Sequence, residues 1–164
     1  MKKRHWIGLL LLALLGLTLA ACGDAGPSAD APFKVAFVYV GPVGDLGWSY
    51  AHDQGRQELD EAFDYVETTY IESVPDGPDS ERVFRDYAEQ GYDMVFATSF
   101  GYMDYVLAVG EEYPDVIFEH CTGYKTAENV AIYDGRGYEG WYLAGITAGR
   151  MTESNVLGYV APYP

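Results

Sequence analysis

The chain has 164 residues, with 25 acidic and 10 basic side chains and a formal net charge of −15. Negative charge on this scale repels nucleic acid and anionic lipid head groups, which excludes nucleic acid as the expected partner. Aromatic residues make up 15% of the sequence, including 15 tyrosines, which is too many for a disordered chain. We therefore expect a folded domain with a hydrophobic core.

The first segment has the pattern of an export signal. Three basic residues at positions 2–4 precede an apolar stretch, which is shorter than the roughly 18 apolar residues that a spanning helix needs. The stretch ends in the motif LAAC, which has the form of a bacterial lipobox and whose cysteine is Cys22. We expect a lipoprotein signal peptide at 1–21 and lipidation of Cys22, with an ordinary signal peptide as the alternative. Residues 22–32 then form a flexible tether without apolar periodicity.

After the tether, β-branched and aromatic runs alternate with segments of helical periodicity. Strands are predicted at 33–40, 65–71, 94–98, 116–121, 130–133 and 156–160. Helices are predicted at 49–63, 80–90, 102–113 and 137–151. This alternation predicts an α/β fold with an open parallel sheet and helices on both faces. The last helix carries Gly140, Ala144 and Ala148 at four-residue spacing, a stripe that permits close packing on a sheet.

Ligands of open parallel sheets bind at the carboxyl ends of the strands, near the point where the strand order reverses. That rule selects four loops of the predicted fold as candidate ligand contacts. They are 41–48, 99–104, 119–125 and 134–138.

The first of these loops contains three glycines, but it does not suit a phosphate. The spacing is Gly41-x-x-Gly44-x-x-Gly47, whereas a dinucleotide fingerprint is G-x-G-x-x-G. Pro42 removes a backbone donor, and Asp45 places a carboxylate where the phosphate would lie. A neutral or weakly cationic planar ligand fits better, because a carboxylate accepts hydrogen bonds and an indole offers a stacking face. The alternative is that Trp48 packs in the core and Asp45 caps the next helix.

Ser99 and the histidines raise two further possibilities, a hydrolase and a metal site. Ser99 lies at a predicted strand-to-helix turn, resembling a nucleophile elbow, and His120 could act as its base in a hydrolase. His52 and His120 lack paired ligand spacing, so no metal site and no cofactor are expected. Cys121 lies in an apolar run and is predicted to be a buried structural thiol.

Four segments together resemble the basic membrane protein (BMP) family of substrate-binding lipoproteins of ABC transporters. They are DLGWSYAHDQG at 45–55, ATSFGYM at 97–103, FEHCTGYKT at 118–126 and YEGWYLAG at 138–145. The resemblance covers the chain after the tether. It implies a type I periplasmic-binding fold that captures a purine nucleoside or purine base for uptake and carries out no chemistry.

By this resemblance, Asp45 hydrogen-bonds the ligand, and Trp48 and Phe100 stack on its ring. The predicted ligand-binding residues are Asp45, Trp48, Ser49, Phe100, Gly101 and His120. Ser49 stands where many nucleoside-binding members carry Asn, so the choice between base and nucleoside stays open. A sugar or furanose-type solute on the same fold is the alternative ligand.

Members of this family carry a second lobe that closes over the ligand. We expect 33–164 to be the N-terminal ligand-binding lobe of a truncated chain. The implied partners are the small-molecule ligand, an ABC permease and ATPase, and the membrane through the lipid on Cys22. The implied location is the cell envelope, at the outer face of the plasma membrane or in the periplasm.

Overall fold

The computed structural model describes residues 31–161. The predicted signal peptide, Cys22 and the tether up to residue 30 lie outside this part. The chain divides into two units, residues 1–32 and 33–164, and the fold below belongs to the second. Within the described residues, no helix combines the length and apolar character needed to cross a bilayer.

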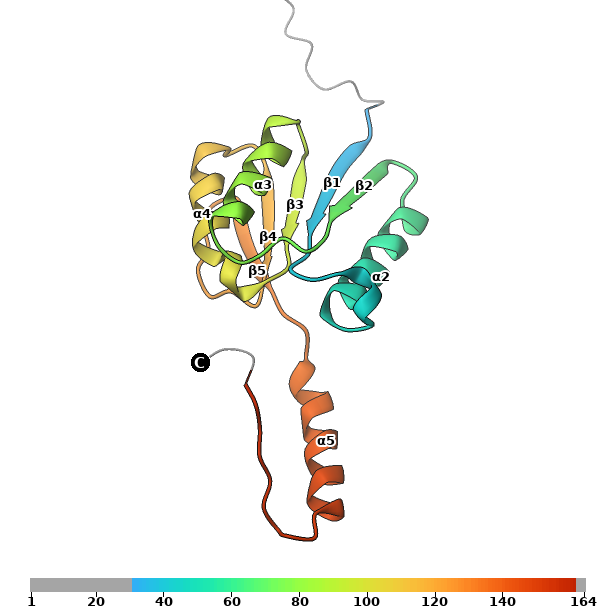
Figure 1. Ribbon diagram of the computed structural model, residues 1–164. Coiled ribbons are helices and arrows are strands. Elements are labelled where there is room, and N and C mark those ends of the chain that lie inside the picture. The colour runs from blue at the N-terminus through green and yellow to red at the C-terminus, as the bar shows by residue number, and fades with distance from the viewer. Residues whose placement is uncertain (1–30, 162–164) are drawn as a thin grey trace, which may run out of the picture. The chain divides into compact units, whose positions relative to one another are not determined.

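A parallel sheet forms the centre of the second unit, with the strand order β2-β1-β3-β4-β5 (Figure 1). Its strands are β1 (Phe33–Val38), β2 (Val66–Ile71), β3 (Met94–Ala97), β4 (Ile117–Cys121) and β5 (Val130–Tyr133). Every pairing between them is parallel, so their carboxyl ends meet at one edge. The chain moves from β1 to β2 on one side and then returns past β1 to β3, which places the switch point at β1 and β3. The predicted α/β class is confirmed.

The helices of the described part are α2 (Trp48–Ala62), α3 (Pro78–Glu89), α4 (Met103–Glu112) and α5 (Gly137–Met151), with short 3-10 turns η1 (Val43–Asp45) and η2 (Phe100–Tyr102). The start of α3 shows why the sequence fixes these bounds. Gly77 takes a φ of +127°, which favours glycine, and Pro78 follows in the first turn, where its missing N–H costs nothing. α4 ends before Pro114, which cannot continue a helix.

Helices cover both faces of the sheet, as predicted. On one face, Phe84 of α3 and Val106 of α4 pack with Phe118 of β4 in the larger core cluster, and Figure 1 shows α3 and α4 beside each other. On the opposite face, Leu59 of α2 packs against the cluster formed by Phe37 and its β1 neighbours. The hydrophobic core therefore has two layers, one on each side of the sheet.

The α2 face is more open over β4 and β5. Ile117 is 41% exposed, and Ala131 is also exposed. Cys121, at the end of β4 on the same face, is buried and forms no disulfide. The prediction of a buried thiol at Cys121 is confirmed.

The predicted strand at 156–160 is wrong, because these residues adopt no regular structure. A strand requires a hydrogen-bonded neighbour, and none pairs with this segment among residues 31–161. Leu157 and Tyr159 of this segment instead lie beside α5, where the rings of Tyr159 and Trp141 are 5.4 Å apart. Ala144 and Ala148 line a hollow of about 460 Å³ between α5 and this segment, rather than packing on the sheet.

Candidate functional site

The candidate site lies at the carboxyl edge of the sheet, where the loops after β1, β2, β3 and β4 meet. The loop after β1 is held by side-chain acceptors at two points. The N–H of Gly41 donates to Ser49 Oγ at 3.2 Å, and the N–H of Val43 donates to Glu72 Oε2 at 2.8 Å. These bonds fix the path of the glycine loop without using Asp45.

Asp45 lies exposed at the rim of this loop. Its Oδ1 accepts a hydrogen bond from the N–H of Gly47 at 2.7 Å, and Leu46 between them takes a φ of +54°. The N-cap of α2 is Gly47 and receives no side-chain cap, so Asp45 does not cap the helix. The carboxylate is therefore held in place by a local turn at the surface, where it can accept further hydrogen bonds.

Trp48 begins α2 and is 45% exposed, so it is not a core residue. Its indole N–H donates to the carbonyl oxygen of Thr98, just beyond β3. The ring of His52 lies 4.8 Å from it at an angle of 53°. The polar edge of the indole is thus anchored to β3 while much of the ring remains open to solvent, which is the arrangement a stacking residue needs.

The turn after β3 brings a second aromatic residue to the same edge. Phe100 is partly exposed, and its ring centroid lies 6.2 Å from that of Tyr124, which is 69% exposed. The carbonyl of Thr98, held by Trp48, immediately precedes this turn. The structure therefore brings Trp48, Phe100 and Gly101 to one edge of the sheet.

Sequence reasoning did not select Asp76, which the structure places at the site. The hydroxyl of Ser99 donates to Asp76 Oδ1 at 2.8 Å, and a side chain at Gly101 would collide with the Asp76 carboxylate. Gly101 thus serves to admit this close approach. The sequence feature that could have pointed to Asp76 is the Pro75–Pro78 turn, because this turn follows β2 at the same carboxyl edge as the other loops.

Ser49 and His120, both predicted to contact the ligand, are buried with 1% and 0% exposure. Ser49 holds the N–H of Gly41, as described above. His120 Nε2 bonds the carbonyl oxygen of Ser99 at 2.7 Å. In this conformation both residues support the backbone of the site from beneath and offer no surface to a ligand.

The same geometry bears on the alternative of a Ser99 hydrolase. A nucleophilic serine needs its hydroxyl at the base nitrogen. Here the imidazole of His120 meets the carbonyl of Ser99, whereas the hydroxyl donates to Asp76. Burial lowers the pKa of His120, partly offset by the hydrogen bond to Ser99. The arrangement supports a positioned turn and does not form a nucleophile–base pair.

α2 is fixed to the sheet by a charged cluster below Trp48. Arg56 Nε donates to Asp53 Oδ1 at 2.7 Å, and the guanidinium lies 4.9 Å from the ring centroid of Tyr70. Burial by itself raises the pKa of Asp53, but hydrogen bonds from Arg56 and Gln57 bring it below its ordinary value. Burial and the nearby Asp53 carboxylate raise the pKa of Tyr39. The cluster sets the position of the helix that carries Trp48.

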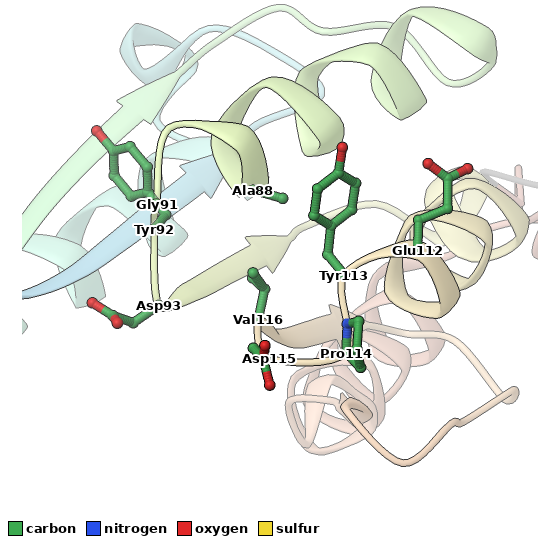
Figure 2. A pocket seen from close by; sticks show the side chains of 9 residues that line it. All are labelled: Ala88, Gly91, Tyr92, Asp93, Glu112, Tyr113, Pro114, Asp115 and Val116. Carbon is green, nitrogen blue, oxygen red and sulfur yellow. The ribbon is translucent and has the colours of Figure 1, made fainter. Parts of the chain in front are cut away.

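A separate hollow of about 390 Å³ lies at the amino edge of the sheet (Figure 2). Its walls come from the end of α3 and from the turns that precede β3 and β4, and they include Asp93, Glu112 and Asp115. Asp93 already accepts from the N–H of Lys34, and Glu112 pairs with Arg85. No cluster of metal-ligating side chains occurs among the described residues. Since no predicted site residue lines this hollow, the carboxyl edge remains the candidate site.

Comparison with known proteins agrees with this fold. Residues 33–164 match the Bmp family model, described as ABC transporter substrate-binding protein PnrA-like. A Haloferax volcanii protein, provisionally named an ABC transporter glucose-binding protein, is 53% identical over 139 residues, covering 85% of this chain and 35% of the relative. A purine-binding protein of Brucella abortus is 49% identical over 137 residues, covering 83% of this chain and 39% of the relative. The chain thus spans well under half the length of these relatives.

Two solved structures share the architecture. They are ABC transporter solute-binding proteins from Conexibacter woesei and Aeropyrum pernix, each with a TM-score of 0.63 and 24% identity. The matches cover 71% and 72% of this chain, and 39% and 32% of those chains. At this identity the likeness concerns the fold alone.

Proposed function

Since the chain belongs to the Bmp family of PnrA-like ABC transporter substrate-binding proteins, we propose that it captures a purine base or purine nucleoside for uptake. The ligand is bound and handed on without a chemical step. An ABC permease and ATPase receive it, and a lipid on Cys22 holds the protein at the outer face of the membrane.

The observation that carries this proposal is the geometry of Trp48 beside Asp45. The indole is anchored through its N–H to Thr98 and remains 45% exposed. Asp45 is exposed three residues earlier, with its carboxylate oriented by the Gly47 N–H. A purine presents a planar ring to the indole, and its amino or hydroxyl groups donate to the carboxylate. Phe100 offers a further ring at the same edge.

A sugar is the second candidate ligand, favoured by the name of the Haloferax volcanii relative. A pyranose also packs an apolar face on tryptophan, and its hydroxyl groups also donate to carboxylates. The Brucella abortus relative, named as purine-binding, favours the purine. The two candidates use the same residues, so only direct binding separates them.

The test is calorimetric titration of the chain with adenine, adenosine, inosine and guanosine, and separately with glucose. We expect heat from at least one purine. Trp48→Ala should weaken that binding about 5- to 150-fold, because stacking of a base on an aromatic ring is worth about 1–3 kcal/mol. Trp141→Ala is the matched control, since Trp141 is 62% exposed on α5 and its ring contacts Tyr159.

Heat from glucose and none from any purine would replace the purine proposal with the sugar alternative. Equal loss of affinity in the Trp48 and Trp141 variants would remove the assigned role of Trp48. Absence of binding to all five compounds would overturn both ligand proposals for this chain.

A further inference from the structure

The turn formed by Thr98–Gly101 is held by three side chains from three different parts of the fold. Trp48 of α2 binds the carbonyl of Thr98, His120 of β4 binds the carbonyl of Ser99, and Asp76 of the β2–α3 loop binds the hydroxyl of Ser99. Two of these contacts are hydrogen bonds to successive carbonyl groups, those of Thr98 and Ser99. A displacement of one of these peptide groups therefore displaces its neighbour.

The contact to His120 defines the protonation of its ring. A carbonyl oxygen only accepts hydrogen bonds, so Nε2 must carry the proton. Nδ1 is buried and has no hydrogen-bond partner among the described residues. A second proton there would have no acceptor, which favours the neutral ring with the proton on Nε2. Burial lowers the pKa of His120 and supports the same form.

The space around the ring fixes its orientation. His120 has no exposed surface, and a side chain at Gly123 would collide with its Nδ1 and Cε1 atoms. Thr122, which lies between His120 and Gly123 in the sequence, takes a φ of +66°, and this bends the chain back over the imidazole. The loop after β4 thus closes over His120 and keeps its Nε2 on the Ser99 carbonyl.

We propose that His120 is a positioning residue for ligand capture, acting through the Ser99 carbonyl to set the turn that carries Phe100 and anchors Trp48. This inference rests on the proposed ligand site. In this proposal His120 does not contact the ligand but positions the turn that does. Gly123 contributes by leaving room for the imidazole ring.

The test compares four variants. His120→Leu removes the donor, and His120→Gln restores an N–H that can reach the Ser99 carbonyl. Gly123→Ala displaces the ring without changing it. Cys121→Ala is the matched control, because Cys121 is buried on the same strand but lies on the other face of the sheet. Affinity is measured by titration with adenine and guanosine, stability by urea unfolding, and the state of the turn by the emission of Trp48, taken as the difference from Trp48→Phe.

We expect His120→Leu and Gly123→Ala to weaken binding about tenfold, since an abandoned buried acceptor is costly, and to shift the emission of Trp48 even without ligand. His120→Gln should bind within about twofold of the parent. Cys121→Ala should lose stability with unchanged affinity and emission.

Parental affinity and emission in His120→Leu would overturn the inference. So would equal loss of affinity in Cys121→Ala, because the effect would then be one of general stability. The emission readout needs no ligand. If the parent binds neither probe, the proposed function fails, whereas the coupling of His120 to the turn is still decided by the emission of Trp48.

Discussion

His52 and His120 each form a hydrogen bond between one ring nitrogen and a backbone carbonyl. His52 Nδ1 bonds the carbonyl of Trp48 at 2.9 Å, as His120 Nε2 bonds that of Ser99. Burial lowers the pKa of both rings from the ordinary value of 6.5, against the opposing effect of these hydrogen bonds. Both imidazoles therefore resist protonation in the folded protein.

This resistance predicts how stability depends on pH. Below about pH 6.5 the unfolded chain binds protons that the folded rings do not, so the free energy of unfolding should fall as the pH drops, until the folded pKa values are passed. His120→Gln removes one of the two rings and should make the fall shallower. Urea unfolding between about pH 5 and 8 measures the difference. Equal slopes for parent and variant would contradict the assignment.

Asp53 and Arg56 fasten α2 to the sheet through contacts within the helix and across to β2. The guanidinium also donates to Thr68 Oγ1 at 3.0 Å, and Gln57 donates to the second oxygen of Asp53 at 2.7 Å. The side chains of Arg56 and Asp53 are only 13% and 8% exposed. The pair is thus largely withdrawn from water, and its loss leaves a charge with little solvation.

Asp53→Ala should lower the free energy of unfolding by about 1–3 kcal/mol, because Arg56 and Gln57 lose a buried acceptor while Arg56 keeps Asp60 as a second partner at 3.0 Å. Asp79→Ala is the control, because Asp79 pairs with Arg82 while both side chains are more than 60% exposed. That change should cost about 1 kcal/mol at most. Urea unfolding of both variants decides the matter, and equal costs would show that the cluster does not hold α2.

The elements themselves were largely predictable, because alternation and helical periodicity are local signals. The strand at 130–133 and the helix at 137–151 match to the residue. The strand at 156–160 failed because apolar character alone does not supply a pairing neighbour. At the candidate site, Asp45 and Trp48 could be selected from the sequence because they lie three residues apart in one loop. Asp76 was missed because its partner Ser99 lies 23 residues further along the chain, a distance that no local pattern spans.

The burial of Ser49 and His120 is a feature that the sequence does not show. Ser49 and His120 have the polar character of ligand contacts, and only the folded backbone shows that Gly41 and Ser99 already use them. A sequence pattern gives the residue type but not the direction in which the side chain points. Positioning residues and contact residues therefore look alike until the fold is known.

The whole molecule carries a formal net charge of −15, with acidic side chains exposed on strands, helices and loops. Mutual repulsion of like charges opposes the compact state, and salt screens it, with a Debye length of about 3 Å at 1 M. The melting temperature should therefore rise as KCl increases from about 0.05 to 1 M. Calorimetric melting measures this, with sucrose as a control that stabilises without screening. An unchanged or falling melting temperature in KCl would show that repulsion is not a significant cost.

Cys121 can report on local unfolding, because it is a buried free thiol. Burial raises the pKa of its thiol to about 11, so the reactive thiolate is scarce while the chain is folded. An alkylating or oxidising reagent reaches the thiol only when the end of β4 opens. The rate of modification is then set by the rate of opening and not by the rate of encounter with the reagent. The modification rate of this buried thiol therefore measures how often the surrounding fold opens.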